Sequence, residues 1–302
     1  MNIVLLKSAS FIIIIMIGYF LKSTNIIKNK DTLLLSKIVM TITLPATILV
    51  SVKSIQLNYV SLLIIILGII PSVVLGFVAK NIFKNHTINE RSIAMNTSSC
   101  YSIGNVTIPY VSALFPMMGM QYVSMFDIGN AITLFGIMPL MSNNSLIRSK
   151  FRITNFIKVL FSSIPFVTYC FIILLNIVNI QLHESIIQLI QPIASANTFL
   201  IMLMIGSTLN LRITRNLISS SIKILTIRIV GLILFSILIY YLLPIPEFAK
   251  SIVILCLASP IATVSVIYSY QIDHNSPLPS FVASVSILVG IALSTIVVMA
   301  LF

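Results

Sequence analysis

The sequence predicts an all-α membrane protein with ten transmembrane helices, and three observations lead to this prediction. Of the 302 residues, 58% are hydrophobic and only 8% are charged, whereas roughly 25% are charged in a typical soluble domain. Ten apolar runs, separated by polar or charged breaks, follow one another along the chain. Each run is close to the length of about 20 residues that an α-helix needs to cross a bilayer.

The ten runs leave little sequence for anything outside the membrane, so the chain is interpreted as one membrane domain. The net charge of +12 does not indicate a nucleic-acid partner, because the basic residues occur in short groups between apolar runs. The cysteines lie inside apolar runs without metal-ligand spacing, so no metal site is expected. The predicted runs are 3–21, 32–52, 59–78, 93–115, 121–141, 156–177, 185–208, 224–243, 251–270 and 280–301.

The lysines and arginines predict the orientation of the chain in the plasma membrane. All of them except Lys7, Lys53 and Lys250 lie in or beside alternate connections that would share one side. Because cytoplasmic loops retain positive charge, both termini of this multi-pass protein are expected to be extracytoplasmic. Arg228 is grouped with the loop residues in this interpretation, and no basic residue is expected deep in a span.

The longest hydrophilic connection divides the chain into two similar halves. It covers residues 142–155 and separates five predicted helices in 1–141 from five in 156–302. Because five is odd, a duplicated unit would insert its second copy upside down, which is the inverted-repeat plan of many secondary transporters. Pro109 and Pro260 support this plan, since they are 151 residues apart, half the length of the chain.

Both prolines fall mid-span among small and polar residues, which predicts that helices four and nine are broken. Proline removes a backbone donor and clashes with the preceding turn. The freed backbone groups must line a cavity or be buried in protein, and positive helix N-termini would favour an anion there. The alternative is that the prolines only kink packed helices. The predicted crossing site consists of Gly104, Asn105, Pro109, Ser259, Pro260 and Thr263.

Further polar residues are predicted to support this site. Asp127 is the only acidic residue well inside a predicted span, which makes it a functional candidate, although it could instead tether a neighbouring helix. Asn130 shares its helix face and could bridge to Asn105. Gly18 and Gly206 are interpreted as close-packing residues. The supporting set is Asn96, Asp127, Asn130, Thr43, Pro45 and Asn197.

Short motifs spread over nearly the whole chain resemble the auxin efflux carrier family. The most specific are the Gly-Asn pair in the fourth predicted span and the six-residue run in the fifth. Where the family usually has a second glycine between this asparagine and the proline, the chain has Thr107, so the local backbone and the specificity are expected to differ. The motifs are Gly18-Tyr19, Leu44-Pro45-Ala46, Gly104-Asn105 followed by Pro109, Phe126-Asp127-Ile128-Gly129-Asn130-Ala131 and Ala258-Ser259-Pro260.

The resemblance implies two inverted five-helix repeats, like those of bile-acid symporters and certain sodium/proton antiporters. It implies that helices four and nine cross at Pro109 and Pro260, with substrate bound between a scaffold and a moving domain, and that Asn105 corresponds to the family's asparagine. Bacterial members carry small organic acids. The long central loop of the plant members is absent here, so malonate or malate is expected rather than auxin.

These patterns together predict a secondary transporter that works by alternating access. Its expected partners are a small organic anion and the lipid bilayer, with a homodimer left open. No glycine-rich phosphate loop is present, so no cofactor is expected and a proton, a sodium ion or the membrane potential would supply the energy. A sensor that retains the fold and a passive anion channel are the alternatives. An enzyme is not expected, because Asp127 has no acidic partner and all three histidines lie in loops.

Overall fold

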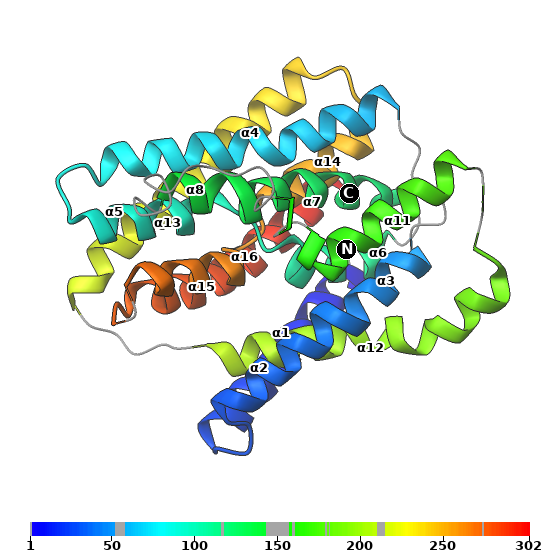
Figure 1. The fold of residues 1–302 in the computed structure, drawn as a ribbon, viewed down its shortest axis with the longest axis horizontal. Helices are drawn as coiled ribbons and strands as arrows, with labels where there is room; N and C mark the ends of the chain where they lie inside the picture. Colours follow the sequence, from blue (N-terminus) through cyan, green and yellow to red (C-terminus); the bar gives the residue numbers. More distant parts are fainter. Residues whose placement is uncertain are drawn as a thin grey trace.

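The computed structural model describes residues 2–51, 58–115, 118–142, 157–158, 161–178, 180, 182–209, 215–273 and 275–302. Within these residues the protein is all-α, apart from one isolated β-bridge (Figure 1). The α-helices are α1 (Asn2–Ser23), α2 (Asn29–Ile38), α3 (Leu44–Ser51), α4 (Tyr59–Ile82), α5 (Ile88–Ser99), α6 (Ile108–Leu114), α7 (Met118–Ile132), α8 (Met138–Ser142), α11 (Ile164–Ile177), α12 (Glu184–Thr208), α13 (Arg215–Leu242), α14 (Glu247–Leu257), α15 (Thr263–Ile272) and α16 (Leu278–Leu301). Wider π-helical turns at Val39–Thr43, Ile103–Thr107 and Thr133–Ile137 join α2 to α3, lead into α6 and join α7 to α8.

The helices overlap all ten predicted apolar runs, and the all-α membrane class is confirmed. Within the described residues, six helical segments are long and apolar enough to cross a bilayer: Lys30–Val50, Tyr59–Ile82, Met118–Ser142, Glu184–Thr208, Leu217–Leu242 and Leu278–Leu301. Ten crossings and the inverted division into 1–141 and 156–302 stay predictions. Nearly all of the predicted connection at 142–155 lies outside the described residues.

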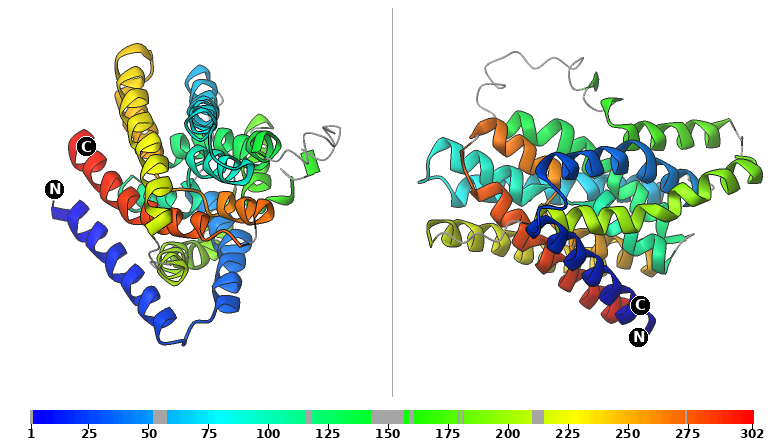
Figure 2. Two further views of the ribbon diagram at one scale, coloured as in Figure 1. Left: turned by 90° about the vertical axis from the view of Figure 1, so that its left-hand side faces the viewer. Right: turned by 90° about the horizontal axis from the view of Figure 1, so that it is seen from below.

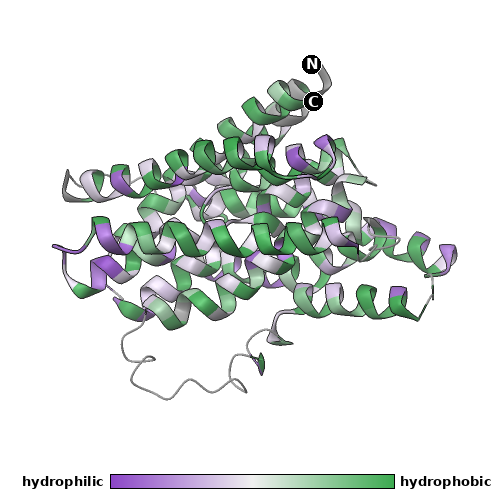
Figure 3. Cartoon of the chain, turned by 90° about the horizontal axis from the view of Figure 1, so that it is seen from above, coloured by the Kyte–Doolittle hydropathy of each residue, from purple (hydrophilic) through white to green (hydrophobic). Residues whose placement is uncertain are grey.

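The molecule is apolar on its outside and partly polar within. Helices α4 and α13 expose large apolar side chains such as Leu62, Ile66 and Ile233, whereas Asn96 and Asn130 are buried in α5 and α7. Hydrophobic residues cover most of the length of the helices in Figure 3. Exposed apolar side chains along helices suit contact with lipid, and buried polar groups in such a protein mark sites where function is concentrated.

Two pairs of helices pack backbone against backbone through glycine, and the α1–α12 pair confirms the close-packing role predicted for Gly18 and Gly206. A Cβ atom at Gly206 would lie 2.0 Å from the carbonyl oxygen of Ile15, and one at Gly18 would lie 2.2 Å from that of Leu203. Small residues at helix contacts in membranes allow this approach, which maximises van der Waals packing. The α4–α7 pair is built in the same way around Gly129.

Substitution of Gly206 by valine is expected to destabilise the protein strongly, because α1 and α12 would have to separate. Overpacking of this kind costs about 1–3 kcal/mol or more, and the thermal unfolding temperature in detergent measures it. Gly104→Ala is the matched control, since its new Cβ would meet only the end of the Leu44 side chain at 3.0 Å. Equal unfolding temperatures for the two variants would contradict the packing argument.

Helices α1, α2, α3 and α12 form one group beside the remaining helices. The helix α2, the π-helical turn at Val39–Thr43 and α3 follow one another without a break and are called the α2–α3 rod. The hydroxyl of Thr43 donates to Asn197 Oδ1 at 2.8 Å, and the Thr32 hydroxyl donates to Ser207 Oγ at 3.2 Å. Both bonds therefore join the α2–α3 rod to α12. The start of α1 and the end of α16 lie next to each other in both views of Figure 2. This agrees with termini on one side of a membrane, and which side that is stays a prediction.

Candidate functional site

Two broken helices meet at the centre of the fold. One chain segment leaves the helical conformation between α5 and the π-helical turn at 103–107, and another does so between α14 and α15. The interruption of both helices in the middle of the bundle was predicted. Two backbone hydrogen bonds join the extended segments, one from the Ser102 N–H to the Pro260 carbonyl (2.9 Å) and one from the Ala262 N–H to the Cys100 carbonyl (3.3 Å), and together they form an antiparallel bridge between Tyr101 and Ile261.

The predicted crossing of Pro109 with Pro260 is wrong at Pro109. Pro260 lies in the second extended segment, whereas Pro109 is buried in the first turn of α6, after the break at residues 100–102. The π-helical turn 103–107 runs directly into α6, and such a local widening allows a helix in a membrane protein to contain proline without ending there. Pro109 therefore marks the helix that follows the break, and the 151-residue offset is not the spacing between the crossing segments.

Asn130 of α7 holds the first broken segment in place. Its Oδ1 accepts a hydrogen bond from the Tyr101 N–H at 3.0 Å, and its Nδ2 donates to the Tyr101 carbonyl at 2.9 Å. Both backbone groups have left the helix ladder and are buried, so they need such partners. The predicted bridge from Asn130 to Asn105 is wrong. Asn105 Oδ1 is buried and has no hydrogen-bond partner among the described residues.

Asp127 extends this network toward α11. Its Oδ1 accepts a hydrogen bond from Asn130 Nδ2 at 3.4 Å, and its Oδ2 accepts one from the Tyr169 hydroxyl at 3.1 Å. The carboxyl group thus links α7, α11 and, through Asn130, the broken segment at Tyr101. Asp127 therefore tethers a neighbouring helix, as one of the two alternatives expected, and it also lines a small cavity beside the crossing, while its functional role stays a prediction.

Arg228 contradicts the expectation that no basic residue lies deep in a span. It belongs to α13, is 8% exposed, and its guanidinium donates to three backbone carbonyls of the broken segments, at Ser98, Cys100 and Ser259. The guanidinium also lies over the Tyr101 ring, 4.7 Å from its centroid. Its position four residues inside the predicted run 224–243 was the signal that should have separated it from the loop residues.

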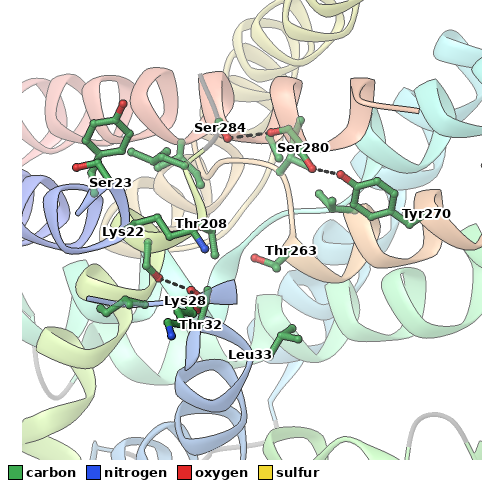
Figure 4. A pocket seen from close by; sticks show the side chains of 18 of the residues that line it. Lys22, Ser23, Lys28, Thr32, Leu33, Thr208, Thr263, Tyr270, Ser280 and Ser284 are labelled. Atoms are coloured by element: carbon green, nitrogen blue, oxygen red, sulfur yellow. Dashed lines mark hydrogen bonds between the residues drawn. The ribbon is translucent and has the colours of Figure 1, made fainter. Parts of the chain in front are cut away.

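A cavity of about 1120 Å³ reaches Ile261 and Thr263 at the crossing (Figure 4). Lys22, Lys28 and Thr32 lie on one side of it, Tyr270 and the α16 hydroxyls on the other, and Thr263 between them. Among the described residues that line it, none is Asp or Glu. The two lysines were predicted only as loop residues, because the sequence does not tell which loops border a cavity.

A second, smaller cavity lies on the other side of Thr263. Its volume is about 60 Å³, and it is lined by Gly104, Asn105, Asp127, Tyr169 and Thr263 among others. The structure thus brings Gly104, Asn105 and Thr263 of the predicted crossing site together with Asp127 and Asn130 of the supporting set.

The remaining predicted residues line neither cavity. Thr43 and Asn197 bond to each other between the α2–α3 rod and α12, and Pro45 is buried on α3 beside them. Asn96 is buried in α5, where neither polar atom of its amide has a partner among the described residues. The Ser259 carbonyl accepts a hydrogen bond from Arg228, while the buried Ser259 hydroxyl has no hydrogen-bond partner among the described residues.

Comparison with known proteins places the chain in a family. A family model described as "Membrane transport protein" matches residues 3–156, just over half of the chain. The matched residues include the first broken helix and also Asp127 and Asn130 of α7. The chain belongs to the membrane transport protein family. No curated protein matches it.

This membrane transport protein carries part of its site outside the matched residues. Arg228, Ser259 and Thr263 all follow residue 156, yet they contact or adjoin the broken helix within the match. Because the chain belongs to this family, its class of function is the movement of a solute across a membrane. The motif resemblance in the sequence indicates the same class of function. Family membership also places the protein among transporters rather than enzymes.

Proposed function

We propose that this membrane transport protein is a secondary transporter of small organic acid anions, such as malonate or malate. The observation that carries the proposal is the large cavity, which begins beside Lys22 and Lys28 and ends at Thr263 on the crossing. A cavity lined by one sign of charge concentrates ligands of the opposite sign. The two lysines therefore supply the direct argument for an anion that the sequence patterns lacked.

The deep end of the cavity adds to this preference. Thr263 opens α15, and no side chain of the described residues caps its first turn. The N-terminal end of a helix carries about half a positive charge on its unpaired N–H groups. An acid that enters past the lysines would meet these groups together with the Thr263 hydroxyl, which can donate a hydrogen bond to a carboxylate.

The two unequal cavities support alternating access rather than a passive channel. The cavity on the lysine side is about 1120 Å³, whereas the space beyond Thr263 is only about 60 Å³. A carrier needs the site closed on one side while it is open on the other. The positive-inside expectation makes the open side cytoplasmic, so the structure corresponds to an inward-facing state in this proposal.

The proposal is tested by counterflow in liposomes that contain the purified protein. We expect labelled malonate or malate to enter vesicles preloaded with unlabelled acid, with saturation. Exchange of Lys22 and Lys28 together for glutamine is expected to raise the half-saturating concentration about tenfold and to weaken its dependence on salt, since two attractive charges are lost.

Lys84→Gln is the matched control for these lysines. Lys84 is exposed on the connection between α4 and α5 and does not line the cavity, so its removal is expected to leave counterflow unchanged. Absence of saturable counterflow for every acid tested, with folded protein, would remove the proposed function. Equal effects of the control and the double variant would remove the cavity as the route of the anion.

A further inference from the structure

We propose that Arg228 is a positioning residue that fixes the two broken helices against each other and keeps the crossing favourable for anions. The second part of this proposal rests on the proposed function, and the first part does not. Arg228 lines neither of the two cavities beside Thr263. It therefore acts through the backbone at the crossing rather than by touching the transported solute.

The contacts of Arg228 tie together segments that are far apart in the sequence. Nη1 donates to the carbonyls of Ser98 and Cys100, both at 3.1 Å, and Nη2 donates to that of Ser259 at 2.8 Å. These carbonyls belong to the ends of α5 and α14. One guanidinium thus bridges two helix ends from a third helix, α13, and its planar fork suits this geometry in a way that the point charge of a lysine does not.

The position of the charge follows from the helix dipoles. Both α5 and α14 end at the crossing, and each C-terminal end carries about half a negative charge on its unpaired carbonyls. Together they make a buried negative region of about one charge, which a guanidinium neutralises. The N-terminal ends of the segments that follow, at Ile103 and Thr263, face the cavities instead. With Arg228 in place, the negative C-terminal ends of α5 and α14 are neutralised. They then no longer oppose the attraction of an anion to the positive N-terminal ends at Ile103 and Thr263.

Among the described residues Arg228 contacts no carboxylate, which separates this arrangement from an ordinary buried ion pair. The charge is shared between three carbonyls and the Tyr101 ring, and Asn130 holds the backbone of the same tyrosine from the other side. Tyr101 is therefore held between α13 and α7. Loss of the arginine is expected to release both broken segments at once, since their carbonyls would lose their shared donor.

Thiol labelling tests the positioning role without any transported solute. Cys100 and Cys256 are buried at the ends of α5 and α14, whereas Cys170 on α11 is half-buried and serves as the internal reference. In the full-length protein in detergent we expect Arg228→Gln to speed the reaction of Cys100 and Cys256 with N-ethylmaleimide at least about tenfold, and Arg228→Lys severalfold. Lys223→Gln, a charge removal on the same helix, is expected to match the wild type.

A second measurement separates electrostatic control from simple loss of packing. Unlabelled malonate and its monoamide compete for counterflow of labelled malonate, and their ratio reports the preference for a second negative charge. We expect Arg228→Gln to reduce this preference about tenfold and Arg228→Lys to retain most of it, because the lysine keeps the charge. A purely structural effect would lower both competitions equally.

The outcomes distinguish the two proposals. No counterflow in the wild type would overturn the proposed function, while the labelling experiment would still decide the positioning role. Wild-type labelling rates in folded Arg228→Gln would overturn the positioning role. If that variant does not fold, the milder Arg228→Lys decides, and labelling of its Cys100 and Cys256 at the wild-type rate would overturn it. An unchanged preference for the second charge would overturn the electrostatic part.

Discussion

Asn130→Ala is expected to abolish transport and to destabilise the protein by about 3 kcal/mol, since a buried polar group left without a partner costs roughly 1–3 kcal/mol. The substitution removes both hydrogen bonds from the Tyr101 backbone, whose N–H and carbonyl have left the helix ladder. Among the described residues these two backbone groups have no other hydrogen-bond partner. Thermal unfolding in detergent and counterflow in liposomes measure the two effects.

Two further variants sharpen this test. Asn176→Ala removes a single bond to Ile172 within α11, at 2.9 Å, and is expected to change little. Asn130→Asp keeps an acceptor for the Tyr101 N–H, but it loses the donor to the carbonyl and brings a second carboxyl group next to Asp127. It is expected to be nearly as damaging as alanine. Wild-type stability and transport in Asn130→Ala would show that the tether is dispensable.

Asp127→Asn is expected to eliminate uptake driven by a pH gradient while exchange of internal for external acid continues. We infer that Asp127 carries the coupling proton, because it is the carboxyl group that lines the small cavity beside the crossing. Each proton that accompanies a dianion inward cancels a charge worth about 2.3 kcal/mol per 100 mV. The asparagine side chain is of similar size and still offers an acceptor to the Tyr169 hydroxyl.

The experiment compares accumulation of labelled malonate in vesicles with an alkaline interior against counterflow without a gradient. We expect accumulation to fall at least about tenfold and counterflow to change less than about threefold, since binding and movement do not require the coupling proton. Asp273→Asn, at the end of α15, is the control and should accumulate normally. Persistent pH-driven accumulation in Asp127→Asn would leave Asp127 with only its contacts to Asn130 and Tyr169.

The fold class and the existence of broken central helices could be predicted from the sequence, because apolar length and low charge leave few alternatives. The exact break in the first helix could not. The segment at Cys100 and Tyr101 contains no glycine or proline that marks an interruption. It is held open by tertiary partners, namely Pro260, Ala262 and Asn130, and such partners are set by three-dimensional proximity.

Part of the candidate site could also be predicted from the sequence, and part of it could not. Gly104, Asn105 and Thr263 line one cavity as a group, because they flank the interruptions that the polar pattern indicated. Pro109 was misplaced, since a local π-helical turn lets a proline stand within a helix without interrupting it. Arg228 was misassigned because counting charges by loop leaves out a cation that finds its partners among carbonyls.

Most hydrogen-bond acceptors at the crossing are backbone carbonyls, which affects how its sequence can change over evolution. Five carbonyls, those of Ser98, Cys100, Tyr101, Ser259 and Pro260, accept the bonds that fix it. Any amino acid supplies a carbonyl, so apart from the Tyr101 ring, which lies against Arg228, side chains at the break are free to diversify and to retune selectivity. The residues that have to be retained are instead the distant donors, Arg228 and Asn130, because no other residue type replaces all of their hydrogen bonds.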